Sequence, residues 1–279
     1  MAYRGRFAPS PTGVLHMGSA VAAVASCLHA RAHDGVWLVR MEDVDENRAV
    51  NGADRAILRS LARLGMVSDE PVLVQSRRTD AYRQALDALK ARGLAYPCGC
   101  SRRLLPASGI YPGTCRNGVR GRPRLWRARV PDAWLAVNDL WQGCYAQHLA
   151  REVGDFVLLR ADGFYAYQLA CVVDDAFQGI THVIRGVDLL HSAPRQRWLQ
   201  RQWGFPEPVY GHFPLVLAAD GRKLSKRERD RSVDLEDPLD VLRFACAHLG
   251  LPRPARGPLA AAWQQAVAAC RAQGFQFSG

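Results

Sequence analysis

The chain has 279 residues, of which 48% are hydrophobic and 23% charged, and its formal net charge is +11. This composition is typical of a globular protein with enough apolar material for a core, so collagen-like, coiled-coil and disordered chains are excluded. The positive charge favours an acidic partner such as a nucleic acid or a nucleotide. The longest apolar stretch, residues 20–28, is too short to span a bilayer, and the first residues do not resemble a signal peptide. We therefore expect a cytoplasmic protein with no membrane partner.

The first half of the chain alternates strand-like and helix-like segments. The pattern predicts strands at residues 4–8 and 36–41 and helices at residues 18–32, 54–64 and 79–92. This β-α-β-α order implies an α/β fold with a parallel sheet and right-handed crossovers. Residues 94–131, which are rich in Gly, Pro, Cys and Arg, interrupt the pattern and are predicted to form an insertion.

Sheet and helix signals return after the insertion. The pattern predicts strands at residues 156–160 and 181–185, an apolar segment at 165–173, a helix at 193–203, and two amphipathic helices after residue 238. Residues 214–225 are typical of a hairpin with an Asp220-Gly221 turn. The expected organisation is an α/β domain over residues 1–205, interrupted by the insertion at 94–131, and a C-terminal subdomain over residues 206–279.

The first motif that carries chemistry follows the first predicted strand. It is the string Arg-Phe-Ala-Pro-Ser-Pro-Thr-Gly-Val-Leu-His-Met-Gly-Ser, which spans residues 6–19. The glycine at 18 permits close approach of a ligand to the backbone, and a helix N-terminus offers free N–H groups to an anion. His16 can donate to a phosphate. A single His-x-Gly is more often a turn whose histidine caps the helix, but the whole string favours phosphate binding.

The second motif is a cluster of four cations, Arg-Lys-Leu-Ser-Lys-Arg, at residues 222–227. Such a cluster is usually a solvated surface loop. Here it contains two of the chain's three lysines, Lys223 and Lys226. An ammonium group on a flexible stem suits an anionic transition state.

The third motif is a group of cysteines in the insertion, Cys98-Gly99-Cys100 and then Cys115. Three thiols beside Gly and Pro turns can bind zinc. The Cys-x-Cys spacing is tighter than usual, and no histidine lies between Cys98 and Cys115, so three unrelated reduced thiols fit the spacing equally well. The remaining five cysteines occur singly and are predicted to be small buried side chains.

Together the first two motifs resemble the signature motifs of class I aminoacyl-tRNA synthetases. Residues 16–19 correspond to the HIGH element and residues 223–227 to KMSKS, with Leu224 in place of Met and Arg227 in place of the last Ser. The segments at 6–13, 40–43, 167–175 and 183–190 are similar to those of glutamyl-tRNA synthetases. The resemblance implies a Rossmann-like catalytic domain with a zinc-binding insertion and a small C-terminal helical subdomain that resembles a stem-contact domain.

The resemblance also implies roles for individual residues. His16, Lys223 and Lys226 are implied to be catalytic, and His16, Gly18 and Lys226 to bind ATP, with which Mg²⁺ arrives. Ala8, Ser10 and Glu42 are implied to surround the α-amino and α-carboxylate groups of L-glutamate, and Arg6, Tyr167 and Arg185 its side-chain carboxylate. The alternatives are a surface acidic pair of Glu42 and Asp43, and an ion pair of Arg185 with Asp188.

For the third motif, the resemblance favours one structural Zn²⁺ per chain. Its implied ligands are Cys98, Cys100 and Cys115, with Tyr111 as the fourth. The alternative for Tyr111 is packing over the metal site without contact to the ion.

The length of the tail distinguishes members of the family. Only residues 228–279 follow the second motif, too few for an anticodon-binding domain, so none is expected. This architecture resembles the glutamyl-queuosine tRNA(Asp) synthetases, which implies activation of glutamate without tRNA and its transfer to queuosine at the wobble position of tRNA(Asp). A monomer is expected. Two alternatives are a truncated glutamyl-tRNA synthetase that charges a 3′ end and a non-catalytic zinc RNA-binding paralogue, although a non-catalytic protein need not retain His16, Lys223 and Lys226.

The insertion is also a candidate RNA-binding surface, because residues 88–131 contain no acidic side chain. Its cations are Lys90, Arg92, Arg102, Arg103, Arg116, Arg120, Arg122, Arg124, Arg127 and Arg129. Trp126 lies among them and could stack on a base or an arginine. The alternative is a solvated basic face with a buried tryptophan.

Overall fold

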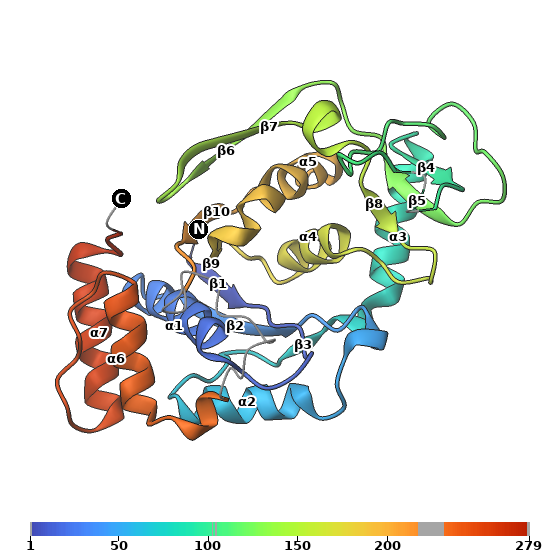
Figure 1. The fold of residues 1–279 in the computed structure, drawn as a ribbon. Coiled ribbons are helices and arrows are strands. Elements are labelled where there is room, and N and C mark those ends of the chain that lie inside the picture. Colours follow the sequence, from blue (N-terminus) through green and yellow to red (C-terminus); the bar gives the residue numbers. More distant parts are fainter. Residues whose placement is uncertain (1, 102, 104, 217–231, 278–279) are drawn as a thin grey trace.

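The computed structural model describes residues 2–101, 103, 105–216 and 232–277. Its main element is a seven-stranded sheet of order β3-β2-β1-β9-β10-β6-β7 (Figure 1). Its strands are β1 (Arg4–Phe7), β2 (Val36–Met41), β3 (Leu73–Val74), β6 (Trp134–Asp139), β7 (Gly143–His148), β9 (His182–Gly186) and β10 (Val209–Phe213). Every neighbouring pair in this sheet is parallel except β6 and β7. The prediction of an α/β fold with a mostly parallel sheet is confirmed.

The helices match the predicted ones closely. They are α1 (Met17–Ala32), α2 (Ala53–Arg63), α3 (Thr79–Ala91), α4 (Tyr167–Phe177), α5 (Ala193–Trp203), α6 (Pro238–His248) and α7 (Leu259–Gln273). Short helical turns are η1 (Glu46–Arg48), η2 (Gln75–Arg78), η4 (Leu149–Val153), η5 (Val187–Ser192) and η6 (Val233–Leu235). The apolar segment at 165–173 forms most of α4. The sequence pattern did not predict β3, β10 or the hairpin of β6 and β7, nor the two strands that lie within the insertion at residues 94–131.

A second, smaller sheet combines two strands of the insertion with one strand that follows it in the chain. It is antiparallel, with the order β4-β5-β8, and consists of β4 (Ala95–Cys98), β5 (Leu125–Ala128) and β8 (Val157–Leu159). The strand predicted at residues 156–160 therefore pairs with the insertion rather than with the main sheet. In Figure 1 this sheet lies at the opposite end of the molecule from α6 and α7.

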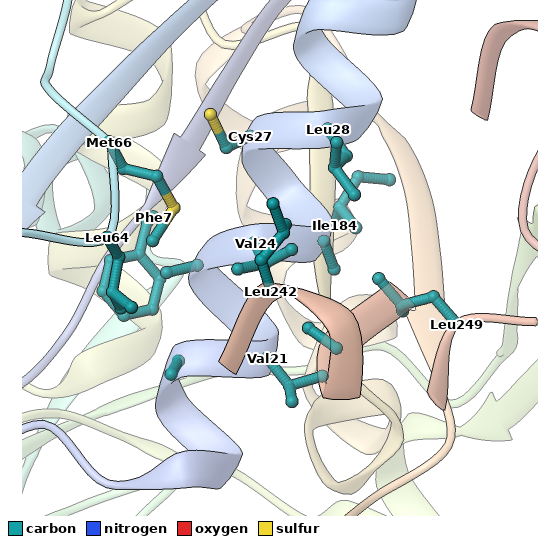
Figure 2. Packing of buried hydrophobic residues seen from close by; sticks show 14 of the residues in the cluster. Phe7, Val21, Val24, Cys27, Leu28, Leu64, Met66, Ile184, Leu242 and Leu249 are labelled. Carbon is teal, nitrogen blue, oxygen red and sulfur yellow. The ribbon is translucent and has the colours of Figure 1, made fainter. Parts of the chain in front are cut away.

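The largest hydrophobic core surrounds α1. This helix is rich in alanine and valine and is buried along almost its whole length. Figure 2 shows Val21, Val24 and Leu28 of α1 among Ile184 of β9 and Leu242 of α6. Small side chains permit this close packing against the sheet on one side and the C-terminal helices on another. Within the described part of the chain, no helix is both long and apolar enough to span a membrane.

The strand order reverses near the centre of the main sheet, between β1 and β9. From β1 the chain passes outward through β2 and β3, and it later returns to place β9 on the other side of β1. Ligands of open α/β sheets bind at the carboxyl ends of the strands at such a reversal of strand order. The ends of β1, at Phe7, and of β9, at Gly186, flank this position.

Candidate active site

A cavity of about 680 Å³ lies at the carboxyl ends of β1 and β9. The predicted glutamate- and ATP-binding residues that the structure describes all line this cavity: Arg6, Ala8, Ser10, His16, Gly18, Glu42, Tyr167 and Arg185. The structure thus brings together residues that are up to 179 positions apart in the sequence, from Arg6 to Arg185. Lys223, Lys226 and the turn predicted at Asp220-Gly221 lie outside the described residues.

His16 forms the N-cap of α1 and also faces the cavity. Its Nδ1 accepts the backbone N–H of Ser19 at 3.3 Å, and its Nε2 lies 2.9 Å from the Ser19 hydroxyl. Because Nδ1 accepts a hydrogen bond, the proton of the neutral ring resides on Nε2. The first turn of α1 contains no acidic residue, so its N-terminus keeps the partial positive charge that favours an anion.

A buried network of charges supports one wall of the cavity. Asp175 of α4 accepts from Arg6 Nε at 3.1 Å and from Arg40 Nη1 at 2.7 Å. Burial alone would raise the pKa of Asp175, but the guanidinium groups of Arg40 and Arg6 hold it well below its ordinary value. Arg6 therefore lines the cavity and also pairs with Asp175. This pairing was not predicted from the sequence.

Glu42 lies in the same network at the end of β2. Its carboxylate accepts from Arg40 Nη2 at 3.1 Å, and burial raises its pKa although Arg40 acts in the opposite direction. The alternative of a surface acidic pair with Asp43 does not apply, because the Asp43 carboxylate instead accepts from the backbone N–H of Ser76 at 2.8 Å and from its hydroxyl at 2.7 Å. Glu42 is thus a carboxylate that is only 10% exposed and lines the cavity.

Arg185 is buried at the end of β9, and its side chain is held by three partners. It donates from Nη1 to the Tyr167 hydroxyl at 3.2 Å, from Nη2 to the Leu189 carbonyl at 3.2 Å, and from Nε to His212 Nε2 at 2.9 Å. Tyr167, at the first turn of α4, was predicted beside Arg185. His212 was missed, because it lies on β10, a strand that the sequence pattern did not reveal.

The three cysteines of the insertion also come together. The sulfur atoms of Cys98, Cys100 and Cys115 all lie within 4.8 Å of one another and are buried. Cys100 and Cys115 are 3.7 Å apart, and Tyr111 Oη lies 3.3 Å from Cys98 Sγ and 3.6 Å from Cys100 Sγ. Zinc–sulfur bonds of about 2.3 Å at tetrahedral angles place two sulfurs about 3.8 Å apart. The donor set therefore fits a tetrahedral metal ion, with the Tyr111 oxygen in the fourth position.

The surroundings of this cluster reinforce its geometry. Burial would raise the pKa of the Cys115 thiol, but backbone N–H groups of Arg120 and Gly99 lower it to about 6. A Cβ on Gly99 would lie 2.2 Å from the Arg120 carbonyl oxygen, so glycine is needed for this close approach. The Arg127 guanidinium lies 3.8 Å from the centre of the Tyr111 ring and holds it in place.

The structure divides the cations of the insertion into two groups. Arg116 and Arg127 are internal: Arg116 forms a two-point ion pair with Asp155, and Arg127 donates to the Asp155 carbonyl at 2.8 Å. Lys90 lies 4.1 Å from the centre of the half-buried Trp126 ring, so that ring already has a cation on it. Among the described cations, by contrast, the exposed side chains are those of Arg92, Arg103, Arg120, Arg122 and Arg124, while Arg102 lies outside the described residues.

Known proteins with similar sequence and structure agree on the family. The catalytic-domain family of class I tRNA synthetases (E and Q) matches residues 2–107 and 116–251. A glutamyl-Q tRNA(Asp) synthetase from Cupriavidus metallidurans is 55% identical over 89% of this chain and 85% of its own length. One from Janthinobacterium sp. is 52% identical over 96% of both chains.

Among solved structures, a glutamate-tRNA synthetase from Elizabethkingia anophelis superposes with a TM-score of 0.82 at 27% identity over 96% of this chain. This chain covers 65% of that synthetase, which is less than two thirds of its length. The curated relatives, in contrast, are matched over most of their length. The chain therefore belongs to the glutamyl-Q tRNA(Asp) synthetases, within the class I tRNA synthetases for E and Q.

Proposed function

We propose that this protein activates L-glutamate with ATP to form glutamyl-AMP without tRNA, and then transfers glutamate to queuosine at the wobble position of tRNA(Asp). The observation that carries the first step is the presence of opposite charges in one cavity. Arg185 and Tyr167 offer donors for a carboxylate, and Glu42 offers an anion for an ammonium group. The names of relatives at 52–55% identity support queuosine on tRNA(Asp) as the acceptor.

In the first step, the α-carboxylate of glutamate attacks the α-phosphorus of ATP, and the bond to pyrophosphate breaks. No general base is needed, because the carboxylate is already ionised at neutral pH. His16 and the N-terminus of α1, including Gly18, face the cavity and would stabilise the charge on the phosphates. Lys223 and Lys226, whose positions lie outside the described residues, are proposed to act on the same charge. Mg²⁺ enters with ATP and keeps few protein ligands.

The glutamate would lie with its side chain toward β9 and its amino group toward β2. Arg185 binds the side-chain carboxylate with help from Tyr167, and Glu42 pairs with the ammonium, with Ala8 and Ser10 beside it. Arg6 contributes less directly than the sequence analysis proposed, because its Nε and Nη2 already donate to Asp175. In the second step, a queuosine hydroxyl attacks the acyl carbon of glutamyl-AMP, and AMP leaves.

We further propose that the cysteine cluster holds one structural Zn²⁺ through Cys98, Cys100, Cys115 and Tyr111. The support is the donor geometry described above. Bound there, zinc would cross-link the insertion in closed coordination and take no part in the reaction. The monomeric state, the cytoplasmic location and the division at residue 205 remain predictions.

The decisive experiment has two stages. ATP–pyrophosphate exchange is measured with glutamate and no tRNA, and glutamate-dependent exchange is expected. Radiolabelled glutamate is then offered with tRNA(Asp) that carries or lacks queuosine, and nuclease cleavage separates the anticodon loop from the acceptor end. Label in the anticodon fragment of the queuosine-containing tRNA is expected. Label at the 3′ end would instead establish the truncated glutamyl-tRNA synthetase. If no ATP–pyrophosphate exchange occurs even when tRNA is present, a non-catalytic RNA-binding protein would be favoured.

A further inference from the structure

Three side chains form a hydrogen-bonded row across the carboxyl ends of three adjacent strands. Arg185 is on β9, His212 on β10 and Asp139 at the end of β6, in the spatial order β9-β10-β6. His212 is the direct register partner of Arg185. Arg185 Nε lies 2.9 Å from His212 Nε2, and His212 Nδ1 lies 2.5 Å from Asp139 Oδ2. His212 is 0% exposed and Asp139 is 8% exposed, so water does not compete for these contacts.

The donors and acceptors of this row admit one arrangement of protons. A guanidinium has only N–H donors, so His212 Nε2 must accept from Arg185. The ring therefore carries its proton on Nδ1, where the Asp139 carboxylate accepts it. Burial lowers the pKa of His212, although the bond to Asp139 acts in the opposite direction, and the neutral ring that this arrangement requires is thereby favoured.

The row determines which part of Arg185 is available to a ligand. A guanidinium has five N–H groups, and His212, Tyr167 and the Leu189 carbonyl each take one among the described residues. One N–H on Nη1 and one on Nη2 remain. These two atoms form the end of the fork that binds a carboxylate with two parallel hydrogen bonds.

We propose that His212 and Asp139 are positioning residues that hold Arg185 in the orientation needed to distinguish the carboxylate of glutamate from the amide of glutamine. The inference rests on the proposed function, because it requires that Arg185 contacts the substrate side chain. Neither residue touches the substrate. Asp139 sets the position of the proton on His212, and His212 supplies the acceptor that fixes the guanidinium plane.

The substitution Asp139→Asn tests the proton arrangement with almost no change in shape. Asp139 Oδ1 accepts three backbone N–H groups, from Trp141 at 3.0 Å, Gln142 at 3.1 Å and His212 at 3.1 Å. In the variant the amide oxygen must keep this place, so the NH₂ group faces His212 Nδ1. The ring then has to accept at Nδ1 and carry its proton on Nε2, where it meets the N–H of Arg185. The Nε2–H of His212 and the Nε–H of Arg185 are both donors and now face each other. Arg185 therefore loses the acceptor that holds its guanidinium group.

The kinetic readout is ATP–pyrophosphate exchange with glutamate and with glutamine. Hydrogen bonds to charged groups contribute about 1.5–3 kcal/mol, so the KM for glutamate should rise about 10- to 100-fold in Asp139→Asn. The preference of the enzyme for glutamate over glutamine, measured as the ratio of kcat/KM, should become smaller. The KM for ATP should not change. His212→Gln, which keeps an acceptor for Arg185 and a donor for Asp139, should retain more glutamate affinity than Asp139→Asn. Gln142→Ala is the matched control, because it removes only a hydrogen bond to the His212 carbonyl.

A spectroscopic readout is independent of activity. Nitrogen-15 NMR of histidine-labelled protein, with the His212 signal identified by its loss in His212→Gln, should show Nδ1 protonated in the wild type and Nε2 protonated in Asp139→Asn. The inference would be overturned if the His212 ring of the wild type is protonated on Nε2. It would also be overturned if Asp139→Asn changes neither the KM for glutamate nor the preference for glutamate over glutamine. If the wild type shows no glutamate-dependent exchange, the proposed function fails, and the NMR spectra decide separately whether the proton arrangement holds.

Discussion

Asp175 Oδ1 lies 2.7 Å from Arg40 Nη1 in the interior of the protein, where Arg40 is 0% exposed. The same carboxylate accepts from Arg6, so it serves two buried guanidinium groups, although Arg40 also donates to the Glu42 carboxylate. Asp175→Asn removes that anion. Because a buried charge that loses its partner is costly, the free energy of unfolding should fall by about 3–5 kcal/mol, measured by urea denaturation. Asp54→Asn, at an exposed position on α2, is the control.

The contribution of ionised Asp175 to the free energy of unfolding should depend on pH in a definite direction. The pKa of Asp175 is lower in the folded protein than in the unfolded chain. Its contribution to stability is therefore complete above the ordinary aspartate pKa and is lost as the pH falls through the lower, folded-state value. Wild type and Asp175→Asn should converge in stability under acid. A difference below about 1 kcal/mol at neutral pH, within the range of an exposed pair, would contradict the role of Asp175.

Glu42 should control how glutamate binding responds to pH. Burial raises the pKa of Glu42 above its ordinary value, and only the ionised form attracts an ammonium group. The KM for glutamate should therefore rise as the pH falls from neutrality toward that pKa. In Glu42→Gln the KM should be about 10- to 100-fold higher at neutral pH, and it should vary little with pH in this range. Parallel pH profiles of the two proteins would refute the assignment, and Glu152→Gln, at an exposed position, serves as the control.

Removing one thiol of the cysteine cluster should release the metal. We expect about one equivalent of zinc per chain in protein purified without chelators, and almost none in Cys115→Ser. Cys144 on β7 is exposed, contrary to the prediction that the single cysteines are buried, and Cys144→Ser should keep the full equivalent. Tyr111→Phe should bind zinc more weakly in competition with a chelator, because it lacks the oxygen that lies near Cys98 and Cys100. Unchanged affinity in that variant would limit Tyr111 to packing.

The exposed arginines of the insertion should contribute to tRNA binding. Arg120, Arg122 and Arg124 are exposed, whereas Arg116 and Arg127 are engaged inside the insertion. Phosphate contacts release counterions, so replacing the three exposed arginines with serine should reduce the salt slope of log Kd by about 2–3.

The control removes the same charge elsewhere, by substitution of Arg55, Arg59 and Arg253, which are also exposed. If the two triple variants bind queuosine-containing tRNA(Asp) with the same salt slope, the tRNA does not contact this face of the insertion.

Elements with strong local signals were predictable from the sequence. The bounds of β2 and α5 agree with prediction, because an apolar run marks the strand and a glycine at 204 ends the helix. The β6–β7 hairpin was missed, because both strands carry polar residues on both faces. In addition, Trp134 of β6 is 64% exposed, and only the last residue of β7, His148, is buried. Strand β3 has only two residues and offers too short a pattern.

The candidate site was predictable to the extent that it follows contiguous motifs. His16, Glu42 and Arg185 each lie in a recognisable string and line the cavity. The partners Asp139 and His212 could not be found in the same way. Their proximity depends on the order of strands in the sheet, which periodicity along one strand does not contain.

Helix α1 carries His16 at its N-terminus and is packed along its length against both the main sheet and the C-terminal helices. Any opening of α6 and α7 would therefore loosen the helix that presents the phosphate-binding end to the cavity. By thermodynamic linkage, a nucleotide bound at that end must in turn protect the C-terminal helices from opening. Amide hydrogen exchange in α6 and α7 would thus report on occupancy of a site that those helices do not line.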